Sequence, residues 1–142
     1  MNTIILAFFV AIFWGISPVI NKIILIDVSY HTIIFISGLT FFISSLFYCY
    51  IYKKQISIDL EIHKNKIIYI VIVAFFSLFL ANLFYYNAIK YTNNVAIITS
   101  ITALYPLITL ILSYLILNEK MSLFNLLGII LIVIGVLFLI IK

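Results

Sequence analysis

Residues 122–141 read SLFNLLGIILIVIGVLFLII, twenty consecutive residues without a charged side chain. An α-helix rises about 1.5 Å per residue, so about twenty apolar residues cross the roughly 30 Å hydrocarbon core of a bilayer. The length and composition of this stretch therefore predict a membrane-spanning helix.

Four further apolar runs of similar length precede it, at residues 3–25, 31–52, 67–89 and 95–117. Short polar clusters separate the runs, at residues 27–31, 53–66, 90–94 and 118–120. A lipid-facing strand must close into a barrel, and these runs are too long and too weakly alternating for barrel strands. We predict an all-α membrane protein with five transmembrane helices.

The overall composition agrees with this architecture. The 142 residues are 67% hydrophobic and 8% charged, with a mean hydropathy of +1.37, which is far from the composition of a soluble domain. We expect a single transmembrane domain over residues 1–142, with a retained first helix and no separate soluble domain. Cys49 is the only cysteine, which excludes an internal disulfide and a cysteine-based metal site.

The lysines indicate an orientation in the membrane. The net charge of +4 comes from lysines at the ends of apolar runs, which favours membrane anchoring over nucleic-acid binding. With the N-terminus inside, the inner connections hold Lys53, Lys54, Lys64, Lys66 and Lys120, and the outer side holds Lys22, Lys90 and Lys142. We therefore predict an N-in, C-out topology, with most of the bias coming from one connection.

The sequence contains no recognisable catalytic or metal-binding motif. The two histidines, His31 and His63, fall at helix or loop margins, and neither metal-ligand spacing nor a Gly-rich phosphate loop occurs. The acidic residues Asp27, Asp59, Glu61 and Glu119 lie at run ends or between runs. We predict that the protein is not an enzyme, needs no cofactor and has no proton relay built on a buried carboxylate.

Polar residues in the first run form one candidate group. Trp14, Pro18, Asn21 and Lys22 share one helix face. Pro18 removes the hydrogen bond to the carbonyl of Trp14 and is expected to bend the helix. Lys22 has two interpretations: it extends to the membrane surface, or it contacts substrate or a counter-ion.

The third run carries a second group on one face, consisting of Asn82, Tyr85 and Tyr86. Aromatic residues near a helix end are often interfacial anchors. An amide as deep as Asn82 needs a partner helix or water, so structural bonding and cavity lining both stay open for it.

The fourth run carries a polar stripe of Thr99, Thr102, Pro106, Thr109 and Ser113, with Tyr105 beside it. Hydroxyl groups can bond back to their own helix, so the stripe need not contact substrate. Pro106 predicts a kink, and backbone groups freed at membrane depth are best tolerated beside a cavity or a close neighbour. The stripe is therefore a second candidate cavity wall.

Small residues indicate where helices approach each other. Gly128 and Gly135 lie seven residues apart on one face of the last run, and Ser37 and Gly38 precede Ser44 and Ser45 by the same interval in the second. Small side chains let helices pack closely in lipid. The contact is either within one subunit or at a dimer interface.

Several short motifs recur in a familiar order. They are Tyr86-Asn87-Ala88-Ile89-Lys90-Tyr91-Thr92, the helix with Pro106, the turn Leu117-Asn118-Glu119-Lys120 and the glycine pair of the last run. Together with Trp14-Gly15 and Lys22, they resemble the repeat of the EamA-type transporters in the drug/metabolite transporter superfamily. Asn118 stands where glycine commonly precedes the glutamate.

The resemblance implies a single five-helix repeat of a fold that usually holds two repeats in inverted orientation around a central cavity. One repeat alone leaves a site at the repeat interface incomplete. The resemblance thus implies an antiparallel homodimer or a pair with an oppositely oriented homologue. A fixed N-in orientation, which the lysine bias predicts, would instead favour a heteromer or a parallel assembly. Single-repeat relatives are known in bacteria and archaea, so the resemblance implies a prokaryotic plasma membrane as the expected location.

The function that the resemblance implies is secondary transport or export of a small organic solute by alternating access. Walls from the first, third and fourth helices would line the cavity, while Glu119 is expected to cap its turn. The small multidrug exporters differ, because they bind cations through a first-helix glutamate that this chain lacks. Two alternatives stay open: a lipid-carrier flippase subunit and an assembly factor for a larger membrane complex.

Overall fold

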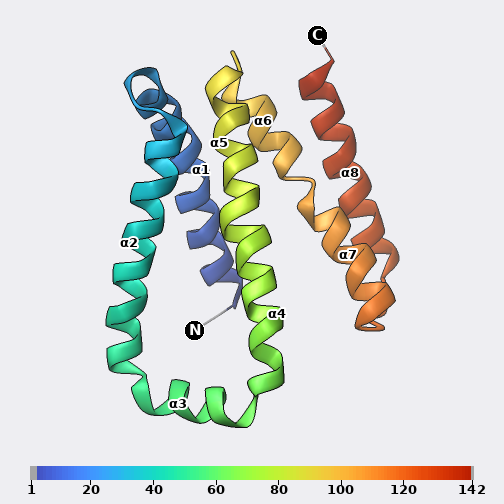
Figure 1. Ribbon diagram of the computed structural model, residues 1–142. Helices are drawn as coiled ribbons and strands as arrows, with labels where there is room; N and C mark the ends of the chain where they lie inside the picture. The colour runs from blue at the N-terminus through green and yellow to red at the C-terminus, as the bar shows by residue number, and fades with distance from the viewer. Residues whose placement is uncertain (1–2, 142) are drawn as a thin grey trace. The chain divides into compact units, whose positions relative to one another are not determined.

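The computed structural model describes residues 3–141, and every regular element in that range is helical (Figure 1). In chain order the elements are α1 (Thr3–Asp27), α2 (Tyr30–Ile51), α3 (Lys53–Ile62), α4 (Lys64–Ala74), η1 (Phe75–Leu80), α5 (Ala81–Tyr91), α6 (Val95–Thr102), α7 (Tyr105–Ile116) and α8 (Leu123–Ile140).

Five stretches of the described chain are long and apolar enough to cross a membrane: Thr3–Asp27, Tyr30–Ile51, Lys64–Tyr91, Val95–Ile116 and Leu123–Ile140. The prediction of an all-helical protein with five transmembrane helices is therefore confirmed. The N-in orientation stays a prediction, and Lys142, which enters it, lies outside the described residues.

The chain divides into two compact units, which we describe separately. The terminal unit consists of residues 3–18 and 92–141 within the described range, and the hairpin unit consists of Val19–Tyr91. The division falls inside α1, which continues as one helix through Pro18. The predicted bend at Pro18 stays a prediction.

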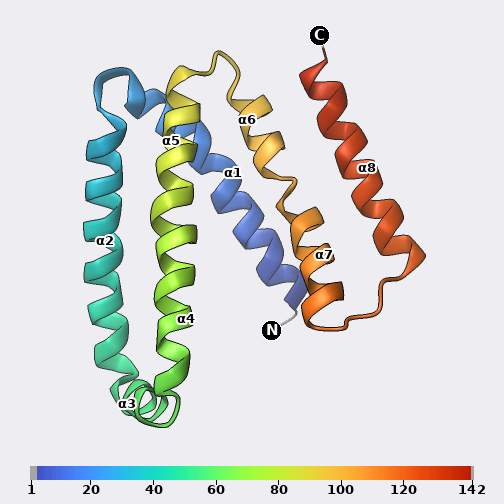
Figure 2. The same ribbon diagram turned by 45° about the vertical axis from the view of Figure 1, so that its right-hand side comes forward.

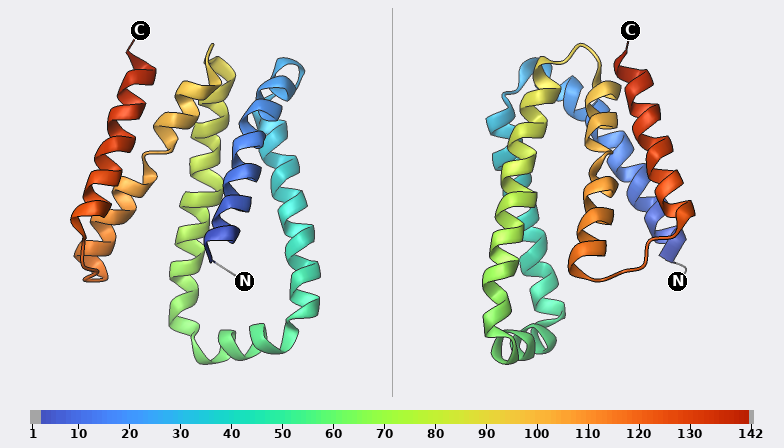
Figure 3. Two further views of the ribbon diagram at one scale, coloured as in Figure 1. Left: turned by 180° about the vertical axis from the view of Figure 1, so that it is seen from behind. Right: turned by 90° about the vertical axis from the view of Figure 1, so that its right-hand side faces the viewer.

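In the hairpin unit, α2 runs antiparallel to the stretch α4-η1-α5, and α3 joins them across one end (Figures 1 and 3). Residues 53–66, predicted only as a polar connection, contain the ten-residue helix α3. The structure also extends the third span to Lys64–Tyr91. Polar and apolar residues alternate along much of α3, so its sequence lacks the 3.6-residue period that would have indicated a helix.

The third span contains a π-helix, η1, which the sequence analysis did not foresee. At its end, the Ala81 N–H donates to the carbonyl of Phe76, five residues back. The rings of Phe75 and Phe79, both in this π-helix, lie with their centroids 5.6 Å apart. Single π-turns inside α-helices are frequent at functional sites, which directs attention to the residues that follow.

In the terminal unit, the predicted helix 95–117 is divided into α6 and α7 by a turn at Ala103 and Leu104 (Figure 2). Pro106 lies in the first turn of α7, where a missing N–H costs no intrahelical hydrogen bond. The proline thus marks a break between two helices, where the sequence analysis expected a kink within one. α8 packs against α6.

Side-chain caps start three of the helices. Ser29 accepts a hydrogen bond from the Thr32 N–H before α2, Asn94 from the Ala96 N–H before α6, and Ser122 from the Asn125 N–H before α8. Each cap satisfies one of the backbone donors that a helix start leaves unpaired. Local sequence therefore determines where these helices begin.

Few apolar side chains are buried within the described chain. The buried large apolar residues there are Leu25, Ile33 and Ile89 in the hairpin unit and Val136 in the terminal unit, whereas most others are exposed. In water this surface would be unstable, but lipid tails or neighbouring helices cover it in a membrane. The protein is an integral membrane protein.

Candidate functional site

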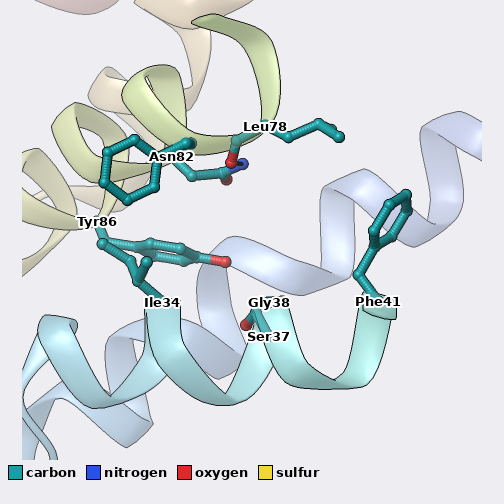
Figure 4. A pocket seen from close by; sticks show the side chains of 8 residues that line it. Ile34, Ser37, Gly38, Phe41, Leu78, Asn82 and Tyr86 are labelled. Carbon is teal, nitrogen blue, oxygen red and sulfur yellow. Dashed lines mark hydrogen bonds between the residues drawn. The ribbon is translucent and has the colours of Figure 1, made fainter. Parts of the chain in front are cut away.

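The hairpin unit contains a cavity of about 290 Å³ between α2 and the η1-α5 stretch (Figure 4). Its lining residues are Ile34, Ser37, Gly38, Phe41, Leu78, Phe79, Asn82 and Tyr86. The volume is near the lower end of the range for small-molecule sites, about 300–1,000 Å³. Such sites are mostly apolar with a few placed polar groups, and Ser37, Asn82 and Tyr86 supply those groups here.

Asn82 satisfies one of its donors within its own helix. Its Nδ2 donates to the carbonyl oxygen of Leu78 at 2.7 Å, in the π-helix immediately before it. No other hydrogen bond to this side chain occurs within residues 3–141. The sequence left two roles open for Asn82, structural hydrogen bonding and cavity lining. In the structure Asn82 has both, because it donates to a backbone carbonyl and also lines the cavity.

Tyr86 lies one helical turn after Asn82 and extends across the cavity. Figure 4 shows its ring reaching from α5 toward Ser37 and Gly38 of α2. The neighbouring Tyr85 is half-buried but does not line this cavity, and the two rings lie 6.0 Å apart. Of the three candidates in the third run, the structure therefore brings two to the cavity.

The α2 wall of this cavity was not anticipated as part of a site. Sequence reasoning placed the cavity between the first, third and fourth helices and took Ser37 and Gly38 as packing residues. At Gly38, an added Cβ would meet no atom within 4 Å, so the glycine leaves open space. The signal in the sequence was present, because small residues in a membrane helix can border a cavity as well as a neighbouring helix.

Lys22 has a role that neither interpretation from the sequence foresaw. Its Nζ donates to the carbonyl oxygens of Ile89 and Lys90, at 3.0 Å each. These carbonyls belong to the last turn of α5, where a helix lacks intrahelical donors and carries partial negative charge. Lys22 therefore caps α5 and connects it to α1. Asn21 is half-buried and also makes an interaction within the chain.

In the terminal unit, Trp14 of α1 contacts Tyr105 at the start of α7. Their ring centroids lie 6.4 Å apart at an interplanar angle of 72°, an edge-to-face arrangement. Aromatic pairs prefer this geometry because the positive edge of one ring meets the negative face of the other. Both side chains stay more than half exposed.

The same unit has a groove of about 590 Å³ between α7 and α8. We call it the α7–α8 groove; its lining residues are Tyr105, Pro106, Thr109, Leu110, Ser113, Glu119, Asn125, Gly128, Ile129 and Ile132. The second half of the predicted polar stripe thus lines one wall. Glu119 also lines the groove, and its expected role of capping its turn stays a prediction.

The threonines of the stripe donate their hydroxyl protons to their own helices. Thr99 donates to the carbonyls of Val95 and Ala96, Thr102 to that of Thr99, and Thr109 to that of Tyr105. Back-bonding of this kind is the alternative that sequence reasoning left open. Their oxygens still carry lone pairs, so a hydroxyl that lines a groove acts there as an acceptor.

The glycines of α8 have no close neighbour within the terminal unit. A Cβ added at Gly128 or Gly135 would meet nothing within 4 Å. Gly128 borders the α7–α8 groove, so the open space beside it belongs to that groove. For Gly135, a contact within one subunit and a contact at a dimer interface both stay open. The dimer itself stays a prediction.

The predicted cavity wall is divided between the two units. Asn21, Lys22, Asn82, Tyr85 and Tyr86 belong to the hairpin unit, and Trp14, Thr99, Thr102, Tyr105 and Thr109 to the terminal unit. Within residues 3–141 there is no cluster of side chains that could hold a metal ion.

Comparison with known families gives one match. The EamA-like transporter family matches residues 1–141, nearly the whole chain. Comparisons with curated proteins and with solved structures returned no match.

Proposed function

Because the chain belongs to the EamA-like transporter family, we propose that it moves a small organic solute across a prokaryotic plasma membrane by alternating access. The family is a transporter family and not an enzyme family, and five membrane-spanning helices agree with membrane transport. Substrate binding, in this proposal, includes the hairpin-unit cavity of Ser37, Asn82 and Tyr86.

The observation that carries the proposal is an amide and a phenol facing one cavity within two membrane spans. A polar side chain at membrane depth costs free energy unless it is paired or lines a polar space. Among the described residues Asn82 uses only one of its donors, and it borders the cavity with Tyr86. These groups can hydrogen-bond a neutral or polar solute, while Phe41 and Phe79 cover its apolar part.

The working form, in our proposal, contains at least two repeats. The described chain exposes most of its large apolar side chains, and the glycines of α8 have open space beside them. In inverted-repeat transporters the site lies between two repeats, and one repeat supplies only part of it. A second copy in antiparallel orientation, or an oppositely inserted homologue, would supply the rest.

Transport can be tested in liposomes that contain the purified protein and a mixed pool of labelled amino acids, nucleosides and sugars. We expect at least one component to leave faster than from protein-free liposomes, and Asn82→Ala to slow it about tenfold. Asn93→Ala, which changes an exposed amide in a connection, is the matched control. A lipid-carrier flippase subunit or an assembly factor would release none of the pool, which would refute the proposal.

A further inference from the structure

The polar lining of the α7–α8 groove consists of one carboxylate, from Glu119, and neutral hydroxyl and amide groups from Tyr105, Thr109, Ser113 and Asn125. Glu119 lines the groove, and its carboxylate forms no ion pair or hydrogen bond within residues 3–141. The hydroxyl of Thr109 donates its proton to the Tyr105 carbonyl at 3.1 Å, so only its lone pairs remain for a ligand. No lysine lines the groove.

The two ends of the groove lie at different positions along the fourth span, and so at different depths in the membrane. Glu119 follows the end of the span Val95–Ile116, whereas Tyr105 and Pro106 lie near the middle of that span, after the turn that divides it. A groove lined by both ends of α7 therefore leads from the membrane surface to about half the depth of the bilayer. Tyr105, at its deep end, contacts Trp14.

We propose that the α7–α8 groove binds a primary alkylammonium ion, with Glu119 and Thr109 accepting its hydrogen bonds; its role as an access path rests on the proposed transport function. A primary ammonium supplies both the positive charge that complements the carboxylate and the N–H donors that fit the lone pairs. It stays protonated at neutral pH, as a lysine side chain does. The apolar side chains Leu110, Ile129 and Ile132 accommodate its alkyl part.

The turn before Glu119 supports this placement. Asn118 adopts a left-handed conformation with φ 54°, and the Glu119 N–H donates to the Ser113 carbonyl at 3.2 Å. The reversed backbone brings the residue after α7 back to the helix that lines the groove. The chain path therefore places the backbone of Glu119 beside the groove.

Binding can be measured on the purified protein in lipid nanodiscs with n-butylammonium as the probe. Trp14 is the only tryptophan, and its contact with Tyr105 makes its fluorescence a reporter of occupancy. Calorimetry with the same probe gives an independent affinity. We expect saturable binding that weakens about tenfold in Glu119→Gln and several-fold in Thr109→Val, because a charged and a neutral acceptor are lost.

Two controls make the result specific. Glu61→Gln removes an exposed carboxylate of α3, outside the groove, and should leave the affinity unchanged. 1-Butanol has the same alkyl chain without the charge and should bind at least about tenfold more weakly. Equal affinities of wild type and Glu119→Gln, equal binding of butanol, or no saturable binding would overturn the proposal.

Transport of the probe separates this proposal from the proposed function. Saturable, Glu119-dependent binding without butylammonium flux in proteoliposomes would confirm the site and count against its role as an access path. Flux of another solute without Glu119-dependent binding would support the transporter and refute the ammonium site.

Discussion

The ammonium group of Lys22 lies 3.0 Å from the carbonyl oxygen of Ile89, a residue whose side chain is fully buried. A second hydrogen bond of the same length joins Lys22 to the carbonyl of Lys90. The first and third spans are thereby connected by a cation at the negative end of a helix, a favourable arrangement in electrostatic terms. Sequence separation of 67 residues makes this a tertiary contact.

Removing this contact should destabilise the protein. Lys22→Met keeps most of the side-chain length but removes both hydrogen bonds, so we expect the free energy of unfolding to fall by about 2 kcal/mol. Unfolding in mixed detergent micelles, followed by circular dichroism, measures the change. Lys54→Met, at an exposed lysine of α3, is the control. An unchanged stability of Lys22→Met would return Lys22 to the role of substrate contact or surface anchor.

Filling the hairpin-unit cavity should stop transport without harming the fold. Gly38→Leu places a large side chain where an added Cβ meets no atom within 4 Å, and leucine favours a helix more than glycine. We expect solute release from liposomes to fall at least about tenfold, with the melting temperature unchanged or raised. Thr40→Leu, on the same helix but outside the cavity, should release solute at the wild-type rate. Wild-type release by Gly38→Leu would place the solute elsewhere.

The conformation of Asn118 predicts an order of stabilities. It is the only non-glycine residue of the described chain with positive φ, at 54°. Asn118→Val should lower the free energy of unfolding by about 1–2 kcal/mol, because a branched Cβ is strained there, whereas Asn118→Gly should be nearly neutral. Chemical denaturation in detergent gives these differences. The same substitution at Asn93, where φ is not positive, should cost less than at Asn118; equal costs would contradict the assignment.

A substitution in α8 should weaken assembly of the subunits without affecting the fold of each subunit. A Cβ added at Gly135 meets no atom within 4 Å in the described chain, so we expect Gly135→Leu to keep the fold while it weakens a subunit interface through this face. Cross-linking in membranes, or energy transfer between labelled subunits, should show the dimer fraction falling about tenfold. Gly15→Leu provides a matched glycine on α1. A dimer fraction that stays at the wild-type value would exclude this face of α8 from the interface.

Orientation in the membrane separates the two forms of assembly. In a Cys49→Ser background, Ser57→Cys reports the side on which α3 lies. The lysines around α3 predict that this site is labelled from the cytoplasmic side only. That result would favour an oppositely inserted homologue as the partner. Comparable labelling from both sides would contradict the fixed orientation and support an antiparallel homodimer.

The sequence by itself determined the class of the protein and the number of its spans. Runs of about twenty apolar residues can only be helices in lipid, since every backbone donor must bond within its own segment. The caps at Ser29, Asn94 and Ser122 likewise act on backbone groups a few residues away. The polar residues that line the two sites, Asn82, Tyr86 and Thr109, were also recognisable, because a polar side chain is conspicuous in an apolar helix.

Only the tertiary structure decided what these residues contact. Lys22 caps α5 because two spans distant in sequence lie together, and no local pattern indicates which carbonyls a lysine reaches. No pattern in the sequence indicated the π-helix η1 or the turn that divides the fourth span before Pro106, and the α2 wall of the cavity exists only where two spans lie together. In lipid the hydrophobic effect does not choose between apolar faces, so small differences in packing and hydrogen bonding decide which faces meet.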